Sequence, residues 1–246
     1  MRLARPFVTL AAAATAAAGL LATAGAVPSG PSGSVTFLVG EASRTAGERT
    51  DALALGSLVY ENDVLETKGR TRLEVRLPDK SVIRIGPRSK VQLVSAIFGR
   101  SAQERKVSAK IVVGNIWAKV TRVAGGESRF EVQTENAVAG VRGTTFRVDA
   151  KADRSVVVKV YSGAVAVAGA GPVPRPAHEG GKKTERHQMP GPQQVSRGQW
   201  ERLVGQMMQI AVAPDGTPAE PQSFALAAPG QDEWEDWNRE RDQASE

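Results

Sequence analysis

The sequence of 246 residues contains no cysteine and only two histidines, and these absences remove several classes of chemistry. Without cysteine there is no disulfide bond, no thiolate nucleophile and no thiolate metal site. His178 and His187 both lie in a segment rich in proline, glycine and charge. Glu179 and Glu185 are the acids beside them, but such a segment lacks the packing that fixes metal ligands or orients a general base. We therefore expect no metal, no cofactor and no enzymatic activity.

Long apolar runs are also scarce, and the one present is at the N-terminus. Arg2 and Arg5 form a positive region, residues 7–21 an apolar region, and residues 24–26 a small-residue cleavage site. These are the three parts of a secretory signal peptide. We expect residues 1–26 to be removed, which predicts a soluble protein in the periplasm or outside the cell. The alternative is an uncleaved membrane anchor, although alanine contributes little to membrane insertion.

Positive charge is unevenly distributed along the chain. The whole chain carries +6, of which the first 26 residues hold +2 and the last sixteen hold −5, so residues 27–230 carry about +9. In an exported protein we expect no nucleic acid partner. Anionic envelope polymers or the chain's own acidic tail are the anionic partners that such a surface could meet. A solvated basic surface with no specific partner is the third interpretation.

The region from Gly33 to about Val167 shows short alternating runs separated by turn residues. TRLEVRL (71–77) and KVQLV (90–94) alternate apolar with polar side chains, and SVIRI (81–85) lies between them. A two-residue period is typical of half-buried strands, and Pro-Asp and Gly-Pro pairs suit the turns between them. The spacing predicts an all-β fold, a solenoid-like stack of short strands or alternatively a β-sandwich.

The composition changes toward the C-terminus. Residues 169–192 are dense in proline, glycine and charge and predict a mobile insertion, whereas residues 193–204 are strand-like. Residues 205–230 predict a linker, despite the apolar MMQIAV within it. Residues 231–246 predict a short acidic helix with Trp234, Trp237 and Arg241 on one face.

The motifs between residues 63 and 200 occur in a recognisable order. IVVGNIWAKV (111–120) and FEVQTENAVAGVRGTTFRV (130–148) are followed by VKVYSGAVAV (158–167) and VSRGQW (195–200). In this order they resemble the FecR domain over roughly Gly33 to Val204. The resemblance implies a periplasmic β domain. It also assigns structural motif positions to Asp63, Asp79, Trp117, Arg142, Gly143, Thr144, Phe146, Gly163 and Gly198.

The best-known members of that family regulate siderophore uptake through a cytoplasmic anti-sigma segment and a transmembrane helix. This chain begins instead with a signal of about 26 residues, so we expect an envelope domain that acts without that cytoplasmic module. The resemblance implies recognition of an envelope protein in signalling or scaffolding. The alternative function is binding of peptidoglycan or another anionic envelope polymer.

Three positions have competing interpretations. Asp63, together with Glu61 and Glu66, lacks calcium-site spacing and is expected to bind nearby backbone amides. Arg142 is expected to reach carbonyls or an acid in a neighbouring turn, with Gly140 and Gly143 relieving a corner. The tryptophans of the acidic tail could dock another protein, or the tail could dock on the basic surface of its own domain.

Overall fold

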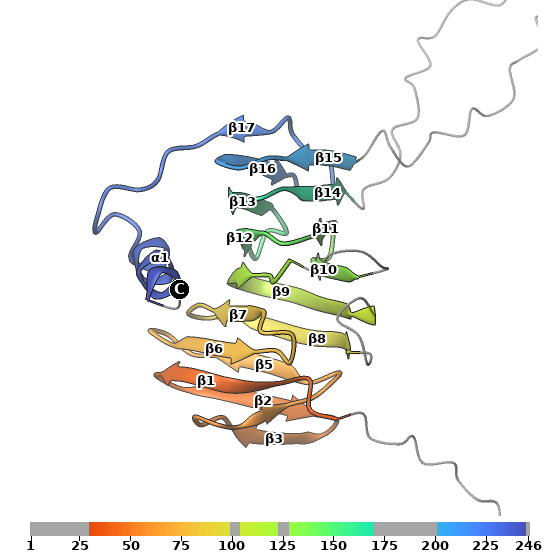
Figure 1. Ribbon diagram of the computed structural model, residues 1–246, viewed down its shortest axis with the longest axis vertical. Coiled ribbons are helices and arrows are strands. Elements are labelled where there is room, and N and C mark those ends of the chain that lie inside the picture. The colour runs from red at the N-terminus through yellow and green to blue at the C-terminus, as the bar shows by residue number, and fades with distance from the viewer. Residues whose placement is uncertain (1–29, 99–103, 123–127, 170–200, 245–246) are drawn as a thin grey trace, which may run out of the picture.

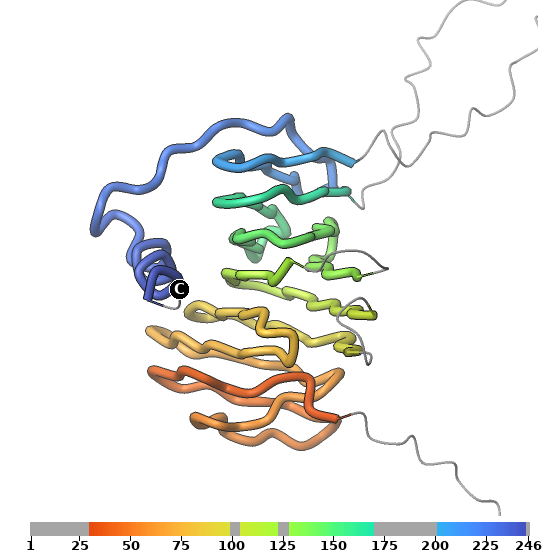
Figure 2. The backbone as a smooth tube through the Cα atoms, viewed as in Figure 1, coloured from red at the N-terminus to blue at the C-terminus, as the bar shows by residue number. Residues whose placement is uncertain are grey.

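The computed structural model describes residues 30–98, 104–122, 128–169 and 201–244. Within these ranges seventeen strands form one open mixed sheet that continues through β9 (Lys106–Lys119), followed by the single helix α1 (Glu233–Gln243). The strands stack as rungs from the N-terminal end to the C-terminal end, and the chain after the last strand returns to the middle of the stack (Figure 2). The predicted all-β stack of short strands with a short C-terminal helix is confirmed.

The continuous sheet divides at β9 into two parts, which we name sheet A and sheet B. Among the described residues every strand pair is antiparallel except β9 with β10, which is parallel. Sheet A consists, in spatial order, of β4 (Leu58–Val59), β1 (Gly33–Val39), β6 (Arg72–Arg76), β7 (Val82–Ile85), the second part of β9, β12 (Thr145–Ala150), β13 (Val156–Ser162), β16 (Met208–Val212) and β17 (Gln222–Ser223). Sheet B consists of β3 (Arg49–Ala52), β2 (Ala42–Ala46), β5 (Val64–Thr67), β8 (Lys90–Ile97), the first part of β9, β10 (Arg129–Gln133), β11 (Ala137–Val141), β14 (Val165–Gly169) and β15 (Glu201–Val204).

One hydrophobic core joins the inward faces of both sheets. In β6 the alternating pattern places Leu73 and Val75 in this core, and in β12 it places Phe146 and Val148 there. The outward side chains of the same strands are the polar ones, as a two-residue period requires. The sequence pattern therefore decides which face of each strand is buried in the core.

The chain passes between the sheets at corners where the backbone is left-handed. Gly114, in the middle of β9, has φ +103°, and it marks the change from sheet B pairing with β8 to sheet A pairing with β7 and β12. Gly143 and Gly163 have φ +63° and +85° at two later corners, and Arg88 and Met207 occupy the same region of φ at others. Glycine adopts this conformation without steric cost, whereas other residues are strained in it.

The structure corrects the expected linker over residues 205–230. This stretch contains β16, which pairs with β13, and β17, which pairs with β16. Ile210 and Val212 point into the core, so their burial stabilises a strand that the neighbouring proline-rich composition concealed. Residues 170–200, which include most of the predicted insertion and Gly198, lie outside the described residues, as do both histidines.

Candidate functional site

Helix α1 lies against the outer face of sheet A, beside the middle of the stack, and an extended segment connects it to β17 (Figure 1). Its N-cap is Asp232, whose carboxylate accepts a hydrogen bond from the Glu235 backbone amide at 3.0 Å. Acids fill the first turn and Arg241 lies in the last, which suits the helix dipole. A helix of eleven residues is marginal on its own, so its stability must come from the sheet beneath it.

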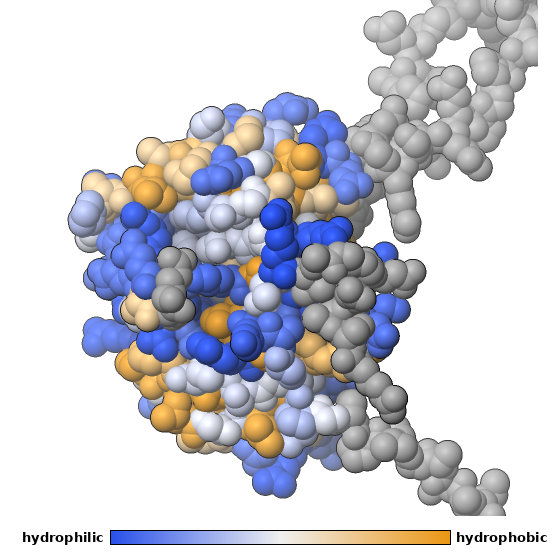
Figure 3. Space-filling model, viewed as in Figure 1, coloured by the Kyte–Doolittle hydropathy of each residue, from blue (hydrophilic) through white to orange (hydrophobic). Residues whose placement is uncertain are grey.

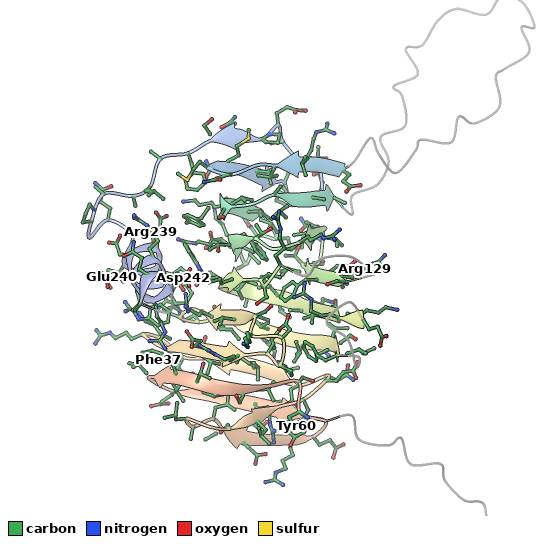
Figure 4. The ribbon with its side chains drawn as sticks, in the orientation of Figure 1. Phe37, Tyr60, Arg129, Arg239, Glu240 and Asp242 are labelled. Carbon is green, nitrogen blue, oxygen red and sulfur yellow. The ribbon has the colours of Figure 1, made fainter. Side chains whose placement is uncertain are left out.

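The part of sheet A that contacts α1 is a row of outward side chains, which we name the helix seat. Glu74 of β6, Arg84 of β7, Trp117 of β9 and Arg147 of β12 are successive cross-strand neighbours. Phe37 of β1 and Tyr161 of β13 lie at the two sides of this row. Figure 4 shows Asp242 on the side of α1 that faces the strands and Glu240 on the far side. The surface over α1 is mostly hydrophilic, whereas apolar residues are more frequent toward the two ends of the stack (Figure 3).

The centre of the seat is a buried ion network. Glu74 accepts hydrogen bonds from Arg84 Nε and Arg241 Nε, both at 2.8 Å, and from Thr36 Oγ1 at 2.6 Å. Arg84 also lies 2.7 Å from Asp242 and donates to the Asn238 backbone carbonyl. Glu74 and Arg84 are 3% and 1% exposed, so these charges depend on one another, on Thr36 and on α1 rather than on water.

The carboxyl group of Glu74 remains ionised in spite of this burial. Desolvation alone would raise its pKa, but hydrogen bonds from Arg241, Thr36 and Arg84 outweigh that effect and lower the pKa to about 2. The folded protein therefore binds this proton less readily than the unfolded chain does. It follows that the network loses its contribution to stability as the pH falls toward 2.

A second set of polar contacts fixes the N-terminal end of α1. Arg147 lies 2.6 Å from Asp232 and 2.8 Å from Asp149. The Tyr161 hydroxyl donates to Glu235 Oε2 at 2.9 Å, and burial with this hydrogen bond raises the pKa of Tyr161. Glu235 is fully buried, yet its other carboxylate oxygen also accepts from the backbone amide of Ala227.

Aromatic rings complete the contact between α1 and the seat. The Trp234 and Trp237 rings stack with centroids 5.3 Å apart, and Trp237 lies 5.4 Å from Phe37. Three guanidinium groups, those of Arg72, Arg84 and Arg241, lie within 6 Å of the Trp237 ring centre. Beneath the C-terminal end of α1, Trp117 Nε1 donates to Asp242 Oδ2 at 2.9 Å, and its ring packs 4.2 Å from Tyr161.

A groove of about 590 Å³ continues the outer face of sheet A beyond α1. Asn115, Asp149, Val157 and Ala211 line it in one cross-strand row, and Arg147, Lys159, Gln209 and Gln222 line it in the next. Ala219 and Glu220 are also among its lining residues. Burial raises the pKa of the Asp149 carboxyl, although Arg147 and Lys159 lower it in part. The groove and the helix seat share Arg147, which contacts both Asp149 and the N-cap of α1.

The predicted motif residues have mostly structural positions. Asp63 accepts a hydrogen bond from the Tyr60 backbone amide at 2.7 Å. Asp79 binds the backbone amide and hydroxyl of Ser81 in the turn between β6 and β7, and it also contacts the buried Arg105. Phe146 is fully buried in the core, whereas Trp117 is buried on the opposite face of sheet A, beneath α1.

The bend from Arg142 to Thr144 corrects the expected role of Gly140. The buried Thr144 donates to the Ala164 carbonyl at 3.0 Å and so connects the bend to the corner at Gly163. Gly143 is the glycine at the corner, whereas Gly140 lies inside β11 with no positive φ. The Arg142 side chain is exposed, so Thr144 is the residue of this bend that joins two buried corners.

This arrangement predicts a contrast between neighbouring substitutions. Thr144→Val should lower the free energy of unfolding by about 1–3 kcal/mol, because it removes a buried hydroxyl and leaves the Ala164 carbonyl without that donor. Arg142→Ala should change it by less than about 1 kcal/mol, because an interaction made by an exposed side chain contributes little to stability. Urea unfolding of both variants tests this. An Arg142 effect equal to or larger than the Thr144 effect would contradict it.

Neither a cluster of metal-ligating side chains nor a membrane-spanning helix is found in the described ranges. No group of three or more histidine, aspartate or glutamate side chains is placed there to hold a metal ion. In the same ranges no helix combines the length and the apolar character that crossing a bilayer requires.

Sequence reasoning did not identify the seat residues Glu74, Arg84 and Arg147, nor Asp149 beside them. Their outward position follows from strand alternation, but this pattern marks outward side chains as solvent-facing. The available signal was the charge of the tail, which is opposite in sign to that of the preceding domain. It indicated docking without indicating the strands involved.

Parts of the chain are similar to known proteins. Two crystal structures of a candidate anti-sigma factor from Parabacteroides distasonis ATCC 8503, at 2.50 and 1.65 Å resolution, are similar to the chain, with TM-scores of 0.44 and 0.43 and identities of 18% and 19%. Each alignment covers 65% of this chain and 59% of the other. A search of the curated proteins found no match.

Residues 63–166 match the sequence model of a family described as FecR protein. This range lies within the predicted domain and contains the strands from β5 to β13, the start of β14 and the Val-Arg-Gly-Thr bend. The resemblance that the motifs indicate is thereby confirmed over residues 63–166.

Proposed function

We propose that this chain is a non-enzymatic protein of the cell envelope, exported to the periplasm or beyond, whose FecR domain recognises another protein in signalling or scaffolding. We propose further that the helix seat is the recognition surface. The observation that supports this is the chemistry of the contact with α1. An acidic, tryptophan-bearing helix lies on arginine, tryptophan and tyrosine side chains, the types that carry most binding energy at protein interfaces.

Helix α1 contacts the seat in the way that a bound peptide would, although it is covalently connected to the domain. Residues 224–232 contain no helix or strand, and they join β17 to a helix too short to be stable alone. A partner that presents an acidic amphipathic helix would bind the same row by the same contacts, as helices bind grooves in other complexes. Helix α1 would then be the intramolecular competitor of that partner.

Removal of residues 231–246 tests this function. We expect the truncated chain to melt several degrees lower than the full chain, because the seat loses its ion pairs and aromatic contacts. We expect a peptide of residues 231–246 to bind the truncated chain and restore its melting temperature. A pull-down from the envelope fraction should recover more partner with the truncated chain than with the full chain.

Two other results would contradict the seat assignment. If only the full chain recovers a partner, then α1 with Trp234, Trp237 and Arg241 is itself the docking element. If the melting temperature is unchanged, α1 does not dock on the seat in solution. Binding of an anionic polymer through the basic surface, the other expected function, would weaken steeply as salt rises. Binding through buried contacts at the seat would weaken much less.

A further inference from the structure

The side chain of Arg241 lies in a slot that two strands of the seat form. Its guanidinium carbon is 4.1 Å from the centroid of the Phe37 ring of β1. Its Nε donates to Glu74 Oε2 of β6 at 2.8 Å, and its Nη2 donates to Oε1 of the same carboxylate at 3.4 Å. Phe37 and Glu74 are cross-strand neighbours, so a flat apolar wall and an acid face the same cation. We name these two side chains the arginine slot.

A β-bulge in β1 provides the apolar wall of the slot. The register with β6 shifts between Val35 and Phe37, and Thr36 is the extra residue. Val35 and Leu38 pack in or against the core, whereas Thr36 and Phe37 both contact groups on the outer face. Strict alternation from Val35 would have turned Phe37 into the core. Bulges re-aim side chains near functional sites, and this one places an aromatic ring on the side of the stack that carries α1 (Figure 4).

The strands of the sheet hold the acid of the slot in position. Thr36 Oγ1 donates to Glu74 Oε1 at 2.6 Å, and Arg84 Nε donates to Glu74 Oε2 at 2.8 Å. Both donors belong to the strands, so the orientation of the carboxylate does not depend on α1 alone. A preorganised acid loses little conformational freedom when it binds a cation, which favours a specific site.

The slot fits a guanidinium group better than an ammonium group. A guanidinium group is planar, lies over aromatic rings and donates in parallel to both oxygens of a carboxylate. Arg241 makes all of these contacts with Phe37 and Glu74. A lysine ammonium is a compact, strongly hydrated charge that cannot place two donors in this fixed fork. The slot should therefore distinguish arginine from lysine.

The charges around the slot alternate in sign between the sheet and α1. Glu74 lies between Arg241 and Arg84. Arg84 in turn lies 2.7 Å from Asp242 of α1. An occupant that is acidic throughout would place a second acid beside Glu74, and like charges in a buried position repel strongly. A partner of the seat must therefore present one cation at this point, although acids fill the first turn of α1.

We propose that the arginine slot binds an arginine side chain of the protein that the seat recognises. This inference rests on the proposed function, in which α1 competes with that partner, and it adds the chemistry that the partner presents. The partner's helix carries an arginine at the position that Arg241 has in α1, and lysine at this position binds more weakly. In the free chain the Arg241 side chain occupies the slot. Phe37 and Glu74 are thus specificity-determining residues of the seat.

Chemical rescue in the full chain tests the slot. Arg241→Ala removes the side chain beyond Cβ. Ethylguanidinium contains the missing atoms, whereas propylammonium contains the corresponding atoms of lysine. We expect Arg241→Ala to melt at a lower temperature than the wild type. Saturating ethylguanidinium should then raise its melting temperature by about 2–4 °C more than propylammonium does.

Two controls isolate the effect of the slot from general effects of the salts. The wild type, whose slot is occupied, reports how each salt changes burial in general. Arg239→Ala removes an arginine from the same helix, and the Arg239 side chain makes no ion pair or ring contact with the described residues. Arg239→Ala should respond to both salts as the wild type does.

Competition between peptides tests whether the slot selects a partner. The full-length Trp237→Ala/Arg241→Ala chain weakens the contact of its own α1, and a labelled peptide of residues 231–246 should bind its seat. The same peptide with Arg241→Lys should bind about tenfold more weakly or worse. The peptide with Arg239→Lys is the matched control and should bind as the parent peptide does. Phe37→Leu in the chain should reduce the difference between arginine and lysine, because the ring is lost while apolar bulk is kept.

The proposal would be overturned if propylammonium rescued Arg241→Ala as well as ethylguanidinium, if neither rescued it, or if the arginine and lysine peptides bound equally. Equal binding would leave recognition at the seat intact and remove only the slot. Rescue by ethylguanidinium without binding of any peptide would mean that the slot serves α1 alone, and the recognition function would fail. Circular dichroism confirms that each variant is folded. Undocking of α1 does not spoil the rescue, because β1 and β6 form the slot.

Discussion

Arg84→Met is expected to lower the free energy of unfolding by about 3–5 kcal/mol, because it removes one member of a buried ion network. Arg84 is 1% exposed and contacts Glu74 of β6 and Asp242 of α1. Methionine fills much of the same space but leaves Glu74 with a smaller set of donors in a buried position. The loss should appear in urea unfolding as a lower midpoint with a similar slope. Arg76→Met, on the exposed outer face of β6, is the matched control and should change stability by less than about 1 kcal/mol.

The pH dependence of unfolding provides a second measurement of the same network. The pKa of Glu74 is about 2 in the folded protein, below its ordinary value of 4.5, so its contribution to stability is complete above pH 4.5. That contribution should be lost as the pH falls from about 5 to 2. In Glu74→Gln this part of the acid dependence should be absent, and the Glu74→Gln/Arg84→Met double variant should be more stable than additivity predicts. A purely additive double variant would show that the two side chains do not act as a unit.

The seat shows where local sequence patterns stop being informative. Alternation in TRLEVRL correctly places Leu73 and Val75 in the core and Glu74 on the other face. The same alternation implies that Glu74 is solvated, whereas it is 3% exposed, because a helix more than 150 residues later in the chain covers it. Periodicity reports which face a side chain is on. It contains no information about what a distant segment places on that face.

The corners between the sheets were only partly predictable for a related reason. Glycine at 143 and 163 indicates a turn from sequence, because glycine tolerates left-handed backbone. Arg70, Arg88 and Met207 adopt the same conformation without any such signal. At these positions the surrounding strands impose the conformation, and the cost is offset by their pairing and core burial. The corner at Gly114 was equally hard to predict from the sequence, since this glycine lies inside a run of apolar strand-forming residues.

Gly114→Ala is expected to lower the free energy of unfolding by about 2–5 kcal/mol, because two independent costs coincide at this corner. The backbone has φ +103°, and a Cβ atom would lie 2.1 Å from Ser89 Oγ and 2.5 Å from Ser89 Cα. Ser89 directly precedes β8, and its backbone cannot move away easily, since its amide and carbonyl are bonded to Thr67 at the end of β5. Two further variants separate the costs. Gly47 has φ +60° and lies in open space, so Gly47→Ala should show only the conformational cost of about 1 kcal/mol. Gly140 lies inside β11 with its nearest neighbour 3.8 Å away, so Gly140→Ala should show neither the conformational cost nor the steric cost. Equal effects at Gly114 and Gly47 in urea unfolding would mean that the contact with Ser89 contributes nothing, and that β9 can change sheets without the close approach that only glycine permits.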